Sequence, residues 1–83
     1  KFSILPNPAR NTATLYINSN ANTMAEIVVR DMIGRIVKTE KAQLTTGGNA
    51  VSLSNLDKLL DGAYIVQVKM GETVVKQKLI ISK

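Results

Sequence analysis

The sequence contains no cysteine and no histidine. Without cysteine the chain cannot form a disulfide, so cysteine usage indicates no redox compartment. The two absences together exclude zinc sites built on thiolate or imidazole, and they exclude nucleophilic sites of the Ser-His and Cys-His kinds. We therefore predict a domain that is not an enzyme, with no catalytic residues, no metal and no other cofactor.

Aromatic residues are also scarce, since the chain has one phenylalanine, two tyrosines and no tryptophan. The 11 basic and 6 acidic residues give a net charge of +5, which can attract nucleic acid, anionic lipid or an acidic protein. The basic residues are scattered, however: Lys38, Lys58 and Lys69 are isolated, and only Lys76 and Lys78 lie two apart on one strand face. Bases would also find no aromatic stacking platform. We therefore predict a solvated basic surface and no nucleic-acid partner.

Long hydrophobic runs are missing as well. No apolar run approaches the ~18 residues that a membrane-spanning helix needs, so we predict no membrane insertion. The 83 residues suit one domain, and the 45% apolar content is ordinary for a globular protein. Because the chain begins at Lys1 rather than methionine, we expect residues 1–83 to be a fragment, with any signal peptide at the far end of a longer precursor.

Apolar residues recur with a period of two, which is typical of half-buried strands. Valine, isoleucine and threonine dominate these runs, and turn-forming residues separate them. The spacing predicts an all-β fold, an immunoglobulin-like antiparallel β-sandwich of about seven strands that matches the constant-type arrangement. The expected strands are Phe2 to Leu5, Ala13 to Asn18, Ala25 to Asp31, Arg35 to Lys41, Asn49 to Leu53, Ala63 to Met70 and Thr73 to Ser82, with a possible helical turn at Asn55 to Leu60. The expected core residues are Leu15, Ile17, Ile27, Val29, Leu53, Tyr64, Val66 and Val68.

Two short motifs mark turns in this pattern. Pro6-Asn7-Pro8 contains two prolines, each of which fixes φ and removes a backbone donor, so the first strand must end or bend and the chain can pass to the other sheet. Asp31-Met32-Ile33-Gly34 has aspartate first and glycine fourth, which predicts a β-turn. Either motif alone indicates only a strand end or a hairpin.

A third motif precedes the sixth expected strand, where Gly62 lies two residues before Tyr64. This spacing is typical of a tyrosine corner, in which the chain bends and the phenol hydroxyl donates a hydrogen bond to the preceding backbone. Such corners occur in many immunoglobulin-like domains, so the corner alone does not select a function.

The last expected strand ends in Lys76-Gln77-Lys78-Leu79-Ile80-Ile81-Ser82-Lys83. Alternation places Leu79 and Ile81 on one face and Lys76, Lys78 and Ile80 on the other. One interpretation is an edge strand whose lysines prevent aggregation. We expect the loss of the final three residues, 81–83, to fray only an edge, because chain ends tolerate trimming.

Together, and in this order, these motifs resemble those of one family: the type A C-terminal sorting domain of the type IX secretion system, also called the Por secretion system. The resemblance covers nearly the whole chain. It implies that residues 1–83 are the tail of a larger secreted precursor of certain Gram-negative bacteria. This tail would be an immunoglobulin-like sorting signal that directs an attached cargo protein across the outer membrane. The resemblance also implies that a sortase-like peptidase usually cleaves the domain off afterwards.

The resemblance further implies partners, locations and residues. The partners would be proteins of the type IX secretion machinery, the sortase-like peptidase and the covalently attached upstream cargo. The domain would pass through the periplasm and then reach the outer membrane and cell surface or be secreted. The recognition signal would consist of Lys76, Lys78, Leu79, Ile80, Ile81, Ser82 and Lys83. The structural motif residues would be Pro6, Asn7, Pro8, Asp31, Gly34, Gly62 and Tyr64.

Two other functions fit the same fold. The domain could be a fibronectin-like or carbohydrate-binding module of a secreted multidomain protein. Such modules usually present exposed aromatic rings to sugars, and here Phe2, Tyr16 and Tyr64 are the only candidates. The domain could also be an adhesin repeat, which would be expected to recur in tandem.

Overall fold

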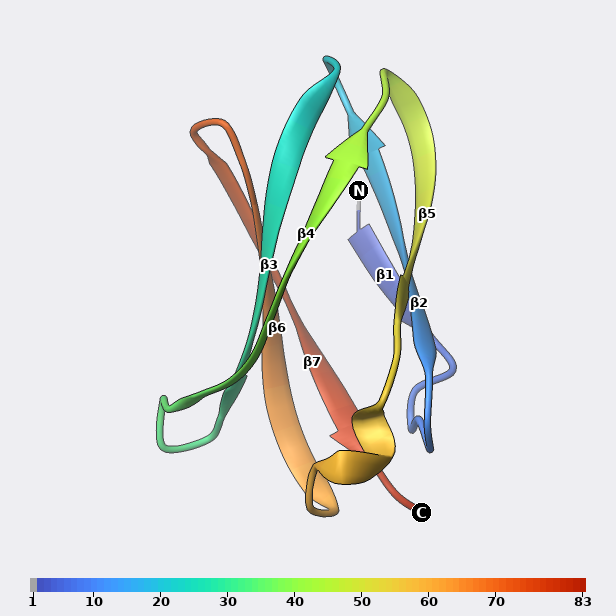
Figure 1. Cartoon of the computed structure of the whole chain (residues 1–83), viewed down its shortest axis with the longest axis vertical. Helices are drawn as coiled ribbons and strands as arrows, with labels where there is room; N and C mark the ends of the chain where they lie inside the picture. Colours follow the sequence, from blue (N-terminus) through green and yellow to red (C-terminus); the bar gives the residue numbers. More distant parts are fainter. Residues whose placement is uncertain (1) are drawn as a thin grey trace.

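Seven β-strands form two antiparallel sheets packed as a sandwich within residues 2–83, the part of the chain that the computed structural model describes (Figure 1). The strands are β1 (Phe2–Leu5), β2 (Ala13–Ser19), β3 (Thr23–Asp31), β4 (Ile36–Leu44), β5 (Gly47–Leu53), β6 (Gly62–Met70) and β7 (Thr73–Ile81). A 3-10 turn, η1 (Leu56–Lys58), lies between β5 and β6. The sandwich, its strands and the expected helical turn are confirmed.

The sheets have the strand orders β1-β2-β5 and β4-β3-β6-β7. This order corrects the constant-type expectation, in which the fourth strand joins the sheet of the first, second and fifth strands. β4 instead pairs with β3, from Thr23 opposite Leu44 to Arg30 opposite Ile36. The cause is the tight turn after Asp31, which returns the chain directly alongside β3 as a hairpin.

The core lies between the two sheets and follows the predicted period of two. Every expected core residue is buried, with exposed fractions between 0 and 6%. Along β6, Tyr64, Val66 and Val68 point into the core, whereas Ile65 and Gln67 between them are half-buried on the outer face. The remaining buried apolar residues are Ile4, Ala9, Ala13, Ala25, Leu44, Leu56, Leu79 and Ile81.

β7 reaches its place through a two-residue hairpin turn at Gly71-Glu72, with Met70 opposite Thr73. Gly71 has φ +61°, as the first central residue of a type II′ turn requires. β7 therefore lies beside β6 as the last strand of its sheet. None of the helical segments within residues 2–83 has the length and apolar character needed to cross a membrane.

Candidate recognition site

The sequence motifs come together at the end of the sandwich that carries the C-terminus, the lower end in Figure 1. The Pro6-Asn7-Pro8 segment, the turn after β3, the corner before β6 and the end of β7 all lie there. The strand register explains part of this arrangement, because Tyr64 pairs with Asp31 on one side and with Leu79 on the other. The β2–β3, β4–β5 and β6–β7 turns occupy the opposite end.

Asp31 organises the β3–β4 turn. Its Oδ1 accepts hydrogen bonds from the backbone N–H groups of Ile33 (3.0 Å) and Arg35 (2.9 Å), and its Oδ2 accepts one from Arg35 Nε (2.8 Å). The Gly34 N–H donates to the Asp31 carbonyl at 3.0 Å, which closes the turn. Gly34 has φ +101°, a conformation that glycine adopts at little cost. The β-turn predicted from Asp31 and Gly34 is confirmed.

The same contacts set the acidity of Asp31. Desolvation tends to raise the pKa of its carboxyl group. The hydrogen bonds from the Arg35 backbone and side chain and from the Ile33 N–H, with the charge of Arg35, outweigh desolvation and hold this pKa below its ordinary value. The carboxylate is therefore charged at neutral pH and is paired within the turn.

The Pro6-Asn7-Pro8 segment carries the chain from one sheet to the edge of the other. β1 ends just before it, and Ala9 just after it forms a parallel bridge with Ile81 of β7. The Ala9 N–H donates to the Ile80 carbonyl at 2.8 Å, and the Ser82 N–H donates to the Ala9 carbonyl at 2.9 Å. The strand end predicted from the two prolines is confirmed. The predicted change of sheet is limited to the bridge at Ala9, because β2 returns to the sheet of β1.

Asn7 extends this pairing with its side chain. Its Nδ2 donates to the Lys78 carbonyl, and its Oδ1 accepts from the Ile80 N–H, both at 2.9 Å. The side-chain amide thus takes the place of a backbone peptide group beside β7. Asn7 and Ala9 together cover the outer edge of β7 from the Lys78 carbonyl to the Ser82 N–H.

Tyr64 forms the predicted tyrosine corner. Its ring is buried, and its hydroxyl donates a 2.5 Å hydrogen bond to the Leu60 carbonyl. η1 occupies the loop before the corner, where Leu56 is fully buried and its N–H donates to the Asn11 carbonyl at 2.9 Å. The corner is therefore tied both to the core and to the segment between β1 and β2.

Lys83 attaches the end of the chain to this corner loop. Its ammonium group donates to the carbonyls of Asp57 (2.9 Å) and Leu59 (2.7 Å). The same group lies 4.0 Å from Oδ1 of Asp61, and the Lys83 backbone N–H donates to that oxygen at 3.3 Å. A basic side chain is well suited to carbonyls at the end of a helical turn, which lack partners within the turn.

The alternation predicted for β7 is confirmed, because Leu79 and Ile81 are buried while Lys76 and Lys78 are exposed. Ile81 is only 1% exposed and also pairs with Gly62 of β6. Removing the last three residues would therefore remove a core side chain. The expectation that this truncation frays only an edge is wrong for that reason.

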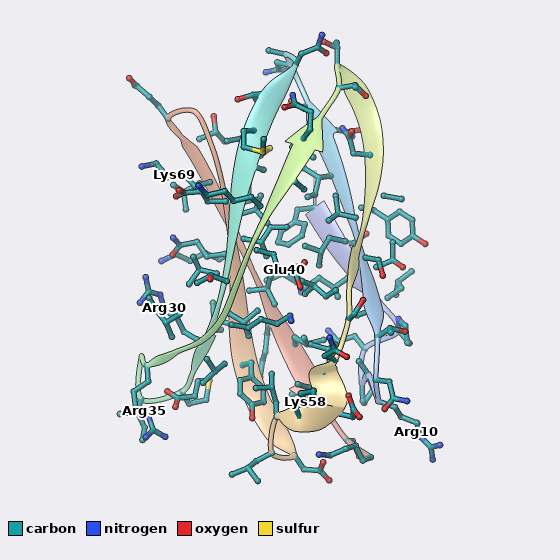
Figure 2. All side chains as sticks on the ribbon, viewed as in Figure 1. Arg10, Arg30, Arg35, Glu40, Lys58 and Lys69 are labelled. Carbon is teal, nitrogen blue, oxygen red and sulfur yellow. The ribbon has the colours of Figure 1, made fainter. Side chains whose placement is uncertain are left out.

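Basic residues that are scattered in the sequence gather on the outer face of the β4-β3-β6-β7 sheet. The register places Arg30 and Lys78 on either side of Ile65. Figure 2 shows Arg30 and Lys69 projecting from the same side of the molecule. The sequence spacing did not reveal this grouping, because it depends on the strand register. We call this surface the basic face, and its charged residues are Arg30, Lys41, Lys69, Lys76, Lys78 and Glu26.

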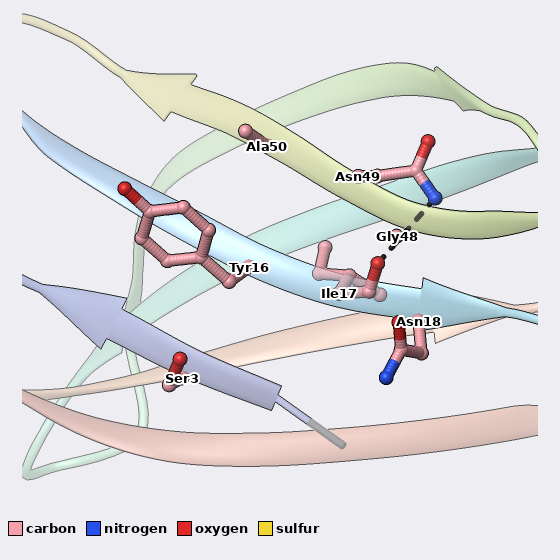
Figure 3. Close-up of a pocket in the computed structure, with 7 residues that line it drawn as sticks. All are labelled: Ser3, Tyr16, Ile17, Asn18, Gly48, Asn49 and Ala50. Carbon is pink, nitrogen blue, oxygen red and sulfur yellow. Dashed lines mark hydrogen bonds between the residues drawn. The ribbon is translucent and has the colours of Figure 1, made fainter.

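The outer face of the β1-β2-β5 sheet has a different character, because the side chains that its described strands present outward are uncharged. Tyr16 stands there beside Asn18 in a shallow hollow (Figure 3). The small residues Ser3 and Ala50 lie opposite Tyr16 on the two neighbouring strands. Tyr16 is 44% exposed, whereas Phe2 packs against the core and Tyr64 is buried. This face therefore exposes one aromatic ring, that of Tyr16, against which a sugar could stack.

Sequence reasoning missed two sets of contacts at the C-terminal end. Ala9 is fully buried and pairs with β7, and a small residue directly after the prolines was the available signal. The carbonyls of Asp57 and Leu59, which hold the Lys83 ammonium group, had no signal in the sequence because any residue supplies a carbonyl. Within residues 2–83, no group of acidic side chains is placed to hold a metal ion.

Comparison with known proteins gives a match that spans all of these motifs. A search of curated proteins found no match. The model of the family described as "Secretion system C-terminal sorting domain" matches residues 3–82, which include Pro6-Asn7-Pro8, the Asp31 turn, the corner and β7. The chain therefore belongs to the secretion system C-terminal sorting domain family, the sorting domains of type IX secretion.

Proposed function

We propose that this domain directs an upstream cargo protein, attached to it covalently, across the outer membrane through the type IX secretion system. A sortase-like peptidase then removes the domain. In this function the domain is a ligand of the machinery and a substrate of the peptidase, and it catalyses no reaction. The observation that carries the proposal is the family match over residues 3–82 of the chain.

The geometry is consistent with this function and divides the motif residues into two groups. Tyr64, Leu79 and Ile81 are buried, so their contribution is to hold the fold in which the signal is presented. Lys76 and Lys78 are exposed on β7 and are available to a protein partner. We therefore propose that the machinery contacts the exposed lysines of β7 and not its buried residues.

The proposed route passes through two compartments. The precursor reaches the periplasm, where the domain folds and is bound by the machinery. The cargo then crosses the outer membrane and is anchored at the cell surface or released. Folding before recognition matters because the Asn7, Ala9 and corner contacts exist only in the folded domain.

A reporter fusion tests the proposal. Residues 1–83 are fused to the C-terminus of a periplasmic reporter that carries its own secretory signal peptide. The fusion is expressed in a bacterium that has the type IX machinery and in a matched strain that lacks it. We expect reporter at the surface or in the medium, shortened by the loss of the domain, only in the first strain. Full-length reporter retained in the periplasm of both strains would contradict the proposal.

Carbohydrate binding is the second candidate function, and the hollow around Tyr16 is the observation in its favour. A single exposed ring gives a sugar little stacking surface. Tyr16→Ala separates the two candidates, because a sorting domain should export its reporter normally with this change. Loss of export in a folded Tyr16→Ala fusion would instead mean that export depends on the outer face of the β1-β2-β5 sheet.

A further inference from the structure

Among the residues that the structure describes, 2–83, only part of the outer edge of β7 is covered. Asn7 and Ala9 bind the outward backbone groups from the Lys78 carbonyl to the Ser82 N–H. β7 is the last strand of its sheet, and no described strand lies beyond it. We call residues 78–81 the anchored half of β7 and residues 73–77 the open half.

The direction of the backbone groups in the open half follows from those in the anchored half. The Ile80 and Ser82 N–H groups point away from β6, towards Asn7 and Ala9. Along a strand, successive residues direct their N–H and carbonyl groups to alternate sides. The register between β6 and β7 is continuous from Gly62 to Met70, so Val74 and Lys76 also direct their backbone groups outward. Within residues 2–83 these groups have no hydrogen-bond partner, so they form a short unpaired ladder.

The other edge of this sheet is protected differently. β4 carries both charge signs, and its Lys38 ammonium lies 3.0 Å from a Glu40 carboxylate oxygen, with both side chains largely shielded from solvent. The β3–β4 pairing also shifts register between Val29 and Arg30. A bulge and inward-pointing charges both discourage strand addition. The β7 edge has neither device, and the charged side chains of β7, Lys76 and Lys78, are both positive.

The positive charge of Lys76 and Lys78 determines which kind of strand can pair with the open half. A second copy of β7 would bring lysines against lysines, and like charges placed opposite each other across strands are destabilising. An acidic strand would be attracted, because Arg30, Lys69 and the lysines of β7 share the basic face with a single acidic residue, Glu26. The lysines therefore repel self-association and favour an acidic partner.

We propose that an extended, acidic segment of the secretion machinery pairs as an additional strand with the open half of β7. The inference rests on the function proposed above, since the partner belongs to that machinery. The outward backbone groups of Val74 and Lys76 supply the hydrogen bonds, and the partner's carboxylates contact Lys76 and Lys78. Asn7 limits the pairing, because it occupies the next outward carbonyl along the edge, that of Lys78.

The backbone part of this inference is tested with Val74→Pro in the reporter fusion. Val74 is 47% exposed, and its N–H points outward, so proline removes a donor from the free edge without removing a bond to β6. The charge is unchanged. The matched control is Val74→Thr, which keeps both the N–H and the β-branched shape. We expect Val74→Pro to lower export about tenfold or more and Val74→Thr to export as the parent does.

The charge part is tested with the double variant Lys76→Glu, Lys78→Glu. Its control is a change of the same sign at Lys58, which is exposed in η1 at the lower end of the sandwich (Figure 2) and is not part of the basic face. We expect the double variant to lower export of the reporter about tenfold or more, and we expect Lys58→Glu to export it at the parent level. Circular dichroism melting of each purified variant ensures that only folded proteins are compared.

The outcomes separate this inference from the function on which it rests. Failure of the parent fusion to be exported contradicts the proposed function and, with it, the inference. If a folded Val74→Pro fusion is exported at the level of the parent fusion, the strand-addition inference is overturned and the proposed function is not affected. Loss of export in the double lysine variant together with normal export of Val74→Pro would also overturn it, because the partner would then be an acidic surface, protein or lipid, that meets only side chains.

Discussion

The two halves of β7 differ although they belong to one continuous strand. The anchored half buries Leu79 and Ile81, and Asn7 and Ala9 cover its outer edge. The open half leaves Val74 exposed and its edge unpaired within the described chain. Leu79 and Ile81 therefore help to hold the fold together near the C-terminus, whereas the edge that we propose for a partner lies further back along the strand.

The largest difference between the halves is expected from truncating one apolar side chain in each. Ile81→Ala should destabilise the domain by about 2–5 kcal/mol, because it removes buried methyl groups and leaves a cavity. Val74→Ala in the open half should change stability by no more than about 0.5 kcal/mol, because the side chain is already half exposed. Urea denaturation of both variants measures the difference. Equal midpoints would show that the end of β7 frays as freely as its beginning.

Tyr64→Phe probes the corner that supports the anchored half, since Tyr64 pairs with Leu79. The change keeps the ring but leaves the Leu60 carbonyl without its donor, so we expect a loss of about 1–3 kcal/mol. Tyr16→Phe, on the exposed ring of the opposite sheet, is the control and should change stability by less than about 0.5 kcal/mol. A Tyr64→Phe midpoint equal to that of the parent would mean that the hydroxyl contributes nothing and the ring is only packed.

Asn7→Ala removes the side-chain part of the cover over the anchored half. Two hydrogen bonds to β7 are lost at a solvent-accessible edge, so we expect a destabilisation of about 0.5–1.5 kcal/mol. Asn22→Ala is the control at the opposite end of the sandwich, where Asn22 accepts a 3.0 Å hydrogen bond from the Thr46 N–H. Stability alone does not separate these variants. Faster amide exchange of Ile80 should occur only in Asn7→Ala, and unchanged exchange there would refute the covering role.

Asp31→Asn should have the smallest effect, visible mainly in acid. The folded-state pKa of Asp31 lies below its ordinary value of 3.8, so its contribution to stability is present above that pH and is lost as pH falls through the folded-state pKa. The parent should therefore melt at lower temperature below about pH 4, and Asp31→Asn should show a shallower dependence there. If the melting temperatures of parent and variant changed with pH in the same way from pH 7 to pH 2, Asp31 would not contribute to the loss of stability in acid.

Local structure was predictable from the sequence where apolar residues alternate regularly or where the residue type favours one backbone conformation. Alternating valine and isoleucine predicted β6 and its buried face, and Gly62 with Tyr64 predicted the corner. The Asp31 turn was predicted as well, but the sequence did not show that it would place β4 beside β3. The alternation of apolar and polar residues in β4 is compatible with either sheet. It therefore did not predict which strand β4 would pair with.

Contacts between distant segments were the part that the sequence could not supply. Two prolines predicted that β1 ends, but the pairing of Ala9 with Ile81 depends on where the chain resumes in space. Arg30 and Lys78 become neighbours across Ile65 only through the register of β3, β6 and β7. The motif residues of the candidate site were therefore predictable, whereas the division of β7 into two halves was not.

Amide hydrogen exchange along β7 tests this division most directly. The N–H groups of Val74, Lys76, Ile80 and Ser82 all point away from β6, so they differ mainly in what covers them. At neutral pH we expect slowed exchange for Ile80 and Ser82, which donate to Asn7 and Ala9, and nearly unprotected exchange for Val74 and Lys76. Protection of Val74 and Lys76 as strong as that of Ile80 would contradict the division of β7 into two halves, because the edge proposed to receive a partner strand would already be closed.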